Sequence, residues 1–72
     1  MPAIIKGLKN NQKIRVIINE VVLNTTVKNA FNLIGNANHR VAISIFLSKI
    51  ANEKIGFYAG NYGPNNIQIN LQ

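Results

Sequence analysis

The segment from His39 to Asn52 constrains the fold more than any other part of this chain, because it is longer than an average strand. Large aliphatic residues at every second position from Val41 to Leu47 would suit a strand, and that alternative stays open on periodicity alone. A serine or asparagine at every fourth position from Ser44 to Asn52 would instead form one polar stripe of a helix. We expect a helix, with Asn36 or Asn38 as N-cap and a broad apolar face. That face would consist of Ala42, Ile43, Phe46, Leu47 and Ile50.

Short β-branched segments separated by asparagine and glycine surround this helix, which favours a mainly β domain. Asn19-Glu20 is a predicted turn, and residues 60–66 form a predicted loop. Residues 54–72 would therefore close the domain as a β-hairpin. The expected strands are Ala3 to Leu8, Lys13 to Ile18, Val21 to Val27, Phe31 to Ile34, Lys54 to Ala59 and Ile67 to Leu71.

The small size of the chain favours association with other copies. A domain of 72 residues buries only about 60% of the surface of its unfolded chain. Cysteine is absent, and one histidine with two glutamates makes a structural metal improbable, so we expect no disulfide, metal or cofactor. The composition, 47% hydrophobic and 14% charged, then predicts a homo-oligomer. The candidate interface residues are Ile43, Phe46, Leu47 and Ile50.

The net charge is +6, and most of the basic residues precede position 29. Such a bias is typical of proteins that bind nucleic acid, an anionic membrane or acidic glycans, and equally of a solvated face that keeps an apolar protein soluble. The predicted basic surface consists of Lys6, Lys9, Lys13, Arg15 and Lys28.

Catalytic chemistry lacks its usual groups. The chain has no aspartate to orient a Ser-His pair, and Glu20 and Glu53 are too far apart in sequence to predict a paired-carboxylate site. His39 at a helix start is more typical of a cap or surface residue. We therefore expect no enzymatic activity and no catalytic residues.

The aromatic and asparagine-rich stretch 57–63 is the predicted binding surface, since rings stack on sugars or bases and amides bond to hydroxyls. The alternative is that Phe57 faces the core, Tyr58 faces solvent or a neighbour, and Tyr62 supports the turn. The candidate ligand-binding residues are Tyr58, Asn61, Tyr62 and Asn65.

Residues 41–71 also follow a pattern of residue types that continues from the helix through an aromatic strand to an alternating strand. It comprises Ala42, Ser44, Leu47, Ala51, Lys54 and Ile55, then Asn66, Ile67 and Ile69. The pattern resembles the C-terminal half of the OB-fold B subunits of AB5-type bacterial toxins. It also resembles the small cytoplasmic crystalline inclusion proteins of insect-pathogenic bacteria, in which residues 31–34 find a counterpart too.

The resemblance implies one OB-fold-like domain over residues 1–72, a five- or six-stranded barrel with one helix near 39–52 and a C-terminal hairpin. It also implies assembly, as a pentameric ring or an extended lattice. We expect a self-assembling homo-oligomer such as a cytoplasmic inclusion protein. The alternatives are a glycan-binding toxin B subunit and a single-stranded nucleic-acid-binding OB protein. The N-terminus does not resemble a secretory signal, and no stretch is long enough to span a bilayer, so we expect a cytoplasmic location unless a signal peptide has been removed.

Overall fold

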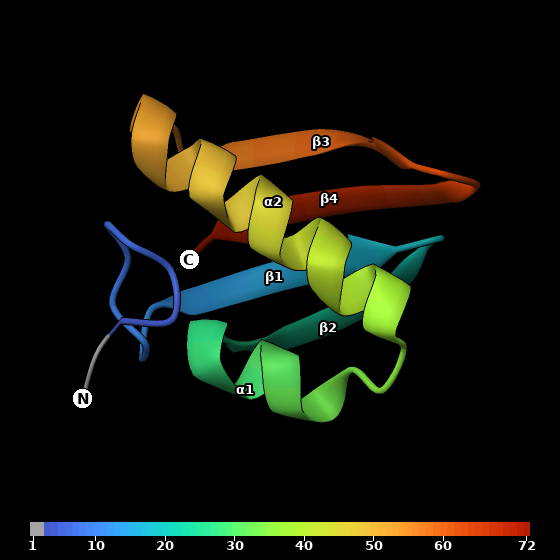
Figure 1. Cartoon of the computed structure of the whole chain (residues 1–72), viewed down its shortest axis with the longest axis horizontal. Coiled ribbons are helices and arrows are strands. Elements are labelled where there is room, and N and C mark those ends of the chain that lie inside the picture. Colours follow the sequence, from blue (N-terminus) through green and yellow to red (C-terminus); the bar gives the residue numbers. More distant parts are fainter. Residues whose placement is uncertain (1–2) are drawn as a thin grey trace.

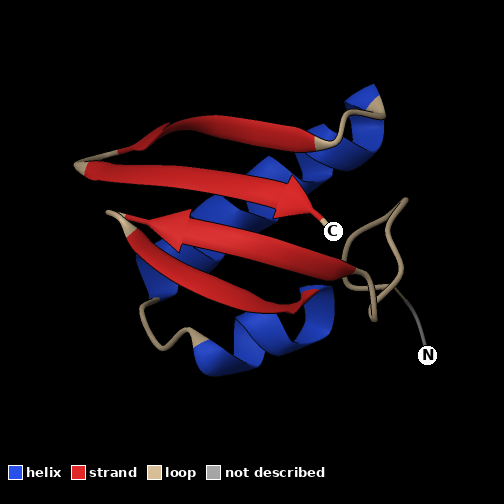
Figure 2. Ribbon diagram, turned by 180° about the vertical axis from the view of Figure 1, so that it is seen from behind, coloured by secondary structure: helices blue, strands red, loops and turns tan. Residues whose placement is uncertain are grey.

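Two β-hairpins enclose two helices in the order of the chain (Figure 1). The computed structural model describes residues 3–72. The elements are β1 (Lys13–Ile18), β2 (Val21–Thr26), α1 (Val27–Leu33), α2 (Ala37–Glu53), β3 (Phe57–Tyr62) and β4 (Asn65–Leu71). The strands form one antiparallel sheet in the order β2-β1-β4-β3, and both helices cover the same face of it (Figure 2).

Both hairpin turns contain residues with left-handed backbone, which asparagine and glycine adopt more readily than glutamate does. Asn19 and Glu20 join β1 to β2 with φ of 49° and 74°, and Gly63 helps to join β3 to β4 with φ of 61°. The turn at Asn19-Glu20 and the C-terminal hairpin are thereby confirmed, but most of the predicted loop 60–66 is wrong, because β3 continues to Tyr62, β4 begins at Asn65 and only residues 63–64 form the turn. The central pair, β1 and β4, comes from opposite ends of the chain, with Val16 opposite Ile69.

The structure confirms helix over strand for the segment 39–52, since α2 covers it completely. Asn36 is the N-cap, and its Oδ1 accepts hydrogen bonds from the backbone N–H groups of Asn38 (2.9 Å) and His39 (3.3 Å). The helix ends at Lys54, whose φ of 55° is left-handed.

The predicted strand Phe31 to Ile34 is wrong, because residues 27–33 form helix α1. Thr26 caps this helix, its Oγ1 accepting from the backbone N–H of Asn29 at 3.3 Å. Val27 and Ala30, one turn apart, are fully buried. The helical spacing of these two residues outweighs the strand preference of the short apolar run that follows.

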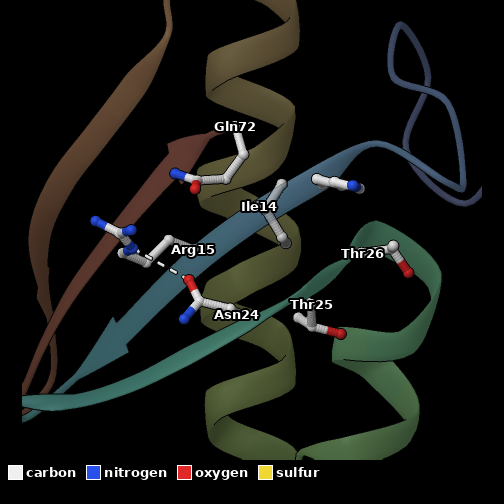
Figure 3. A pocket seen from close by; sticks show the side chains of 7 residues that line it. Ile14, Arg15, Asn24, Thr25, Thr26 and Gln72 are labelled. Carbon is white, nitrogen blue, oxygen red and sulfur yellow. Dashed lines mark hydrogen bonds between the residues drawn. The ribbon is translucent and has the colours of Figure 1, made fainter.

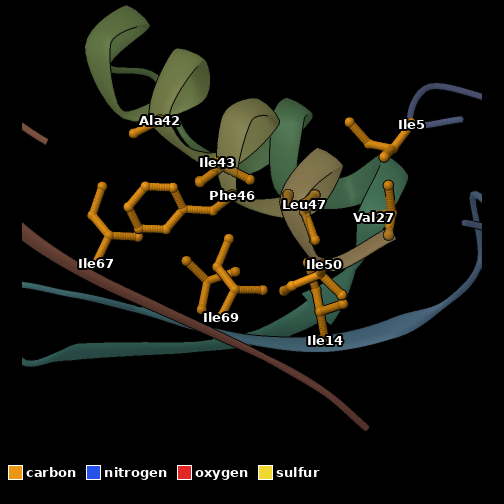
Figure 4. Close-up of a cluster of buried hydrophobic side chains, with 12 residues drawn as sticks. Ile5, Ile14, Val27, Ala42, Ile43, Phe46, Leu47, Ile50, Ile67 and Ile69 are labelled. Atoms are coloured by element: carbon orange, nitrogen blue, oxygen red, sulfur yellow. The ribbon is translucent and has the colours of Figure 1, made fainter. Parts of the chain in front are cut away.

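The four residues expected at an oligomer interface are instead buried in the domain's own core. They face the central strands from α2, and none is more than 5% exposed. Figure 4 shows them above Ile14, Ile67 and Ile69. Side chains enclosed in this way cannot also contact a neighbouring copy, so the prediction is corrected for Ile43, Phe46, Leu47 and Ile50.

The predicted strand Ala3 to Leu8 is also wrong, since this segment forms bends and turns. Gly7, with φ of +96°, packs against Ala51, where an added Cβ would lie 3.1 Å from the Cβ of that alanine. Ile5 is 3% exposed and packs against the hydrophobic core. The segment acts as a cap on the hydrophobic cluster.

The sheet has four strands and is not a closed barrel, so the barrel implied by the resemblance is not formed. The α+β class, the helix and the C-terminal hairpin are as expected. Strands β2 and β3 are left as edges, and one sheet face stays open (Figure 2). Among residues 3–72, no helix combines the length and the apolar character needed to cross a membrane.

Replacing Asn36 by alanine should lower the free energy of unfolding by about 1 kcal/mol, because the first turn of α2 loses the side-chain acceptor for two backbone N–H groups. Urea denaturation measures the effect. Asn32, exposed within α1, provides the control: Asn32→Ala should leave the stability unchanged or slightly higher. Equal losses in both variants would contradict the capping role.

Candidate functional site

The sheet face opposite the helices carries polar side chains interspersed with four apolar ones, and we call it the open face. Along β1 the core takes Ile14 and Val16, whereas Lys13 and Arg15 point away from it. The alternation repeats in β4, where Ile67 and Ile69 are buried and the intervening residues are amides. The open face is formed by Lys13, Arg15, Ile17, Val22, Asn24, Phe57, Ala59, Asn61, Asn66, Gln68 and Asn70.

Strand register aligns four of these side chains in one line across the sheet, which we call the cross-strand row. Arg15 on β1 lies opposite Asn24 on β2 and opposite Asn70 on β4. Asn70 in turn lies opposite Phe57 on β3. Neighbouring strands are about 4.8 Å apart, so the row extends over about 14 Å. It combines a guanidinium, two amides and an aromatic ring that is 57% exposed.

Arg15 is held in place within this row. Its Nε donates a hydrogen bond to Oδ1 of Asn24 at 3.1 Å. Figure 3 shows these two side chains turned toward each other from β1 and β2, with Gln72 at the end of β4. They line a shallow hollow of about 400 Å³ whose full lining is Lys13, Ile14, Arg15, Asn24, Thr25, Thr26 and Gln72. The hollow is therefore bordered by two cations, amides and hydroxyls.

The other end of the open face differs in charge. A second hollow of about 390 Å³ lies there, between the centre of the sheet and the β3–β4 hairpin, and Glu20 borders it. Asn61, Asn66 and Gln68 supply its other polar groups. None of the four strands contains an aspartate or a glutamate. Glu20, in the turn that joins β1 to β2, is the acidic residue closest in sequence to any strand.

The lysines predicted as a basic surface gather at the end of the sheet where β1 begins. The N-terminal loop reaches this end because Gly7 contacts Ala51 of α2. The backbone N–H of Lys28 donates to the carbonyl oxygen of Asn10 at 3.0 Å, which joins α1 to the same loop. Lys54, between α2 and β3, adds a further cation (Figure 1). We call this region the basic end; its exposed lysines are Lys6, Lys9, Lys13, Lys28 and Lys54.

The four candidate ligand-binding residues do not form one surface. Tyr58 is turned toward the helices and packs edge-on against Phe46, with ring centroids 4.9 Å apart. Tyr62 is half-buried on the same side, and Oδ1 of Asn65 accepts a hydrogen bond from Nδ2 of Asn19 at 2.8 Å. Only Asn61 lies on the open face. The structure thus separates the two tyrosines from the asparagine that was expected to bind beside them.

Groups with acid, base or metal-binding chemistry stay dispersed. Glu20 lies in the β1–β2 turn and Glu53 at the C-terminal end of α2, where it pairs with Lys49 at 3.5 Å. His39 is half-buried at the start of α2. Within residues 3–72, no three side chains of the metal-binding types come together.

Sequence reasoning missed Asn24, Asn70 and Lys54 as site residues. It included Phe57 in the predicted binding stretch 57–63 but not among the candidate ligand-binding residues. The alternation of apolar and polar residues in β4 could have indicated that Asn70 shares a face with Gln68, two positions earlier. Phe57 could not be assigned, because one residue of strand register decides between it and Tyr58. Comparison with known proteins adds nothing to these assignments: no family model, curated protein or solved structure matches this chain. The resemblance in residues 41–71 therefore remains a prediction.

Proposed function

We propose that this protein is a non-enzymatic module that binds single-stranded nucleic acid on its open face. The observation that carries the proposal is the cross-strand row, in which Arg15, two amides and Phe57 lie side by side next to the basic end. Each supplies one part of nucleotide recognition. The ring offers a surface on which a base can stack, the amides can bond to base edges, and the cations can neutralise phosphates.

An open sheet suits a single strand better than a duplex. Bases of a single strand can be splayed out and laid on a sheet, where exposed aromatic side chains stack with them. The described part of this face offers no protruding helix or ribbon for a duplex groove. The shallow hollow beside Arg15 would take a sugar or phosphate between Lys13 and Thr26.

Charge would also orient the bound strand. The cations lie at the end of the open face where β1 begins, and Glu20 lies at its other end. Phosphates are therefore expected over the basic end and beside Arg15, with the contacting bases over the rest of the cross-strand row. The attraction to phosphates supplies affinity without sequence preference, and the row supplies whatever preference exists.

Titration of a fluorescent DNA or RNA oligonucleotide of about ten bases by anisotropy tests the proposal. If about four phosphates are neutralised, log K should fall with log salt with a slope of about −3. The same sequence in duplex form should bind more weakly. Absence of binding at about 20 mM salt, where such contacts are strongest, would overturn the proposal.

Phe57→Ala separates stacking from charge. Loss of one stacked base should weaken binding by about 5-fold to 150-fold, since stacking contributes about 1–3 kcal/mol per base. The salt slope should not change, because no cation is removed. Val21→Ala, at a residue that is 70% exposed in β2 but turned away from the open face, is the control and should bind as the parent protein does.

The structure also bears on the two other functions considered from the sequence, glycan binding and self-assembly. Glycan binding was expected at an aromatic and asparagine surface, and the orientation of Tyr58 toward Phe46 removes that cluster. Self-assembly stays a proposal, but the α2 residues expected to mediate it are enclosed in the core.

A further inference from the structure

Both amide oxygens of the cross-strand row are engaged within the protein. Oδ1 of Asn24 accepts a hydrogen bond from Nε of Arg15 at 3.1 Å (Figure 3). Oδ1 of Asn70 accepts from Nε2 of Gln68, two residues earlier on β4, at 3.2 Å. Each oxygen is therefore turned toward another side chain of the open face, and this fixes how its amide group is oriented.

This orientation makes the amide nitrogen the group that each asparagine offers to a ligand. A guanidinium has N–H donors and no acceptor, so the atom of Asn24 that faces Arg15 must be the oxygen. Within residues 3–72, Nδ2 of Asn24, Nδ2 of Asn70 and the two terminal nitrogens of Arg15 donate no hydrogen bond. The row thus presents hydrogen-bond donors beside the exposed ring of Phe57.

We propose that the cross-strand row selects guanine over adenine, an inference that rests on the proposed binding of single strands. One edge of guanine has two adjacent acceptors, O6 and N7, whereas the same edge of adenine places the N6 amino donor beside N7. Asparagine reads adenine by aiming its oxygen and its nitrogen at that edge together. Here the oxygens are held by Arg15 and Gln68, so the amino group of adenine meets donors and stays unpaired.

Phe57 places the purine where this difference is detected. The ring is 57% exposed and lies opposite Asn70 in the sheet, on strands about 4.8 Å apart. A purine stacked on the ring brings its edge next to Nδ2 of Asn70, and Arg15, on the other side of Asn70, remains for a phosphate. Guanine and adenine both have a face that can stack, so the preference comes from the edge alone.

Fluorescence anisotropy with ten-base DNA oligonucleotides, all thymine except for one central purine, tests the inference. The guanine oligonucleotide should bind about fivefold more tightly than the adenine one, which is the lower end of the discrimination that a good base contact provides. Hypoxanthine has the O6 and N7 edge of guanine without the 2-amino group. It should bind as guanine does, which attributes the preference to this edge.

Asn70→Asp replaces the donor by a carboxylate oxygen that accepts from the amino group of adenine. The ratio of the two affinities should fall to one or below, and the added negative charge cancels from this ratio because it acts on both oligonucleotides. Gln68→Ala releases Oδ1 of Asn70, so it should strengthen binding of the adenine oligonucleotide more than that of the guanine one. Asn32→Asp makes the same change in charge at an exposed residue of α1 and should keep the fivefold ratio.

Circular dichroism and the Tm show whether each variant is folded, and both should match the parent protein. An all-thymine oligonucleotide separates this inference from the proposed function. If it binds but guanine and adenine give equal affinities, the base preference is overturned and the proposed function stands. If no oligonucleotide binds, both are overturned. A fivefold ratio that persists in Asn70→Asp would also contradict the inference, since the row would then not be the group that reads the base.

Discussion

Replacing Leu47 by alanine is expected to lower the free energy of unfolding by about 2–5 kcal/mol. Leu47 is 0% exposed and belongs to the cluster between α2 and the central strands. Truncation both removes buried methyl groups and leaves a cavity that this small core can fill only in part. A domain of this length is stable by about 4–11 kcal/mol in total, so much of the variant could be unfolded at 37 °C. Urea denaturation followed by circular dichroism measures the change.

The concentration dependence of that change distinguishes a core residue from an interface residue. If Leu47 packs only within its own chain, the loss should be the same at 1 µM and at 100 µM protein. Ile45→Ala is the matched control two positions away, at a side chain that is 49% exposed. At 1 µM it should cost about 1 kcal/mol or less. A loss for Leu47→Ala that appears only at the higher concentration would return this residue to an oligomer interface.

Local signals in the sequence were sufficient for α2 and for both hairpins. None of Ser44, Ser48 and Asn52 is buried, as the predicted polar stripe requires, although Val41 and Ile45 of the same helix are exposed as well. Asn19 and Gly63 have the left-handed backbone that their residue types favour in tight turns, and Glu20 adopts it next to Asn19. Each of these signals acts over a few residues, so no knowledge of the rest of the fold was needed.

The errors arose where distant contacts decide local structure. Residues 3–8 contain enough aliphatic side chains for a strand, but the central positions of the sheet are taken by β1 and β4, and the segment instead caps the core with Ile5. Likewise, apolar content alone indicated that α2 would contact other copies. It could not show that two hairpins cover one face of the helix within a single chain.

The candidate site depended on strand register, which the sequence does not specify. Arg15 and Asn70 are opposite each other although they are far apart in the chain. In β3, core packing decides which aromatic residue is exposed. Gly60 leaves room for the ring of Phe46, because an added Cβ would lie 3.4 Å from its Cζ, and Tyr58 contacts the same ring. With Tyr58 and Gly60 on the helical side, Phe57 must face the open side.

Reversing the charge of Arg15 is expected to have the largest effect on nucleic-acid binding. Arg15→Glu would replace the one cation of the cross-strand row by an anion that repels phosphates, and it would remove the hydrogen bond to Asn24. We expect affinity for a single-stranded oligonucleotide to fall by about 100-fold at 50 mM salt, which corresponds to about 2.7 kcal/mol. The slope of log K against log salt should become shallower by about 0.7 for each phosphate that the variant no longer neutralises.

Two variants make this result specific to the open face. Arg15→Lys keeps the charge but loses the planar fork that bonds to Asn24, so it should weaken binding only about fivefold and keep the salt slope. Lys49→Glu causes the same change in net charge on the outer side of α2, where Lys49 pairs with Glu53. It should weaken binding less than threefold, because it acts only through the screened field of the whole molecule. Equal losses for Arg15→Glu and Lys49→Glu would mean that net charge alone governs binding, and that the cross-strand row is not the site.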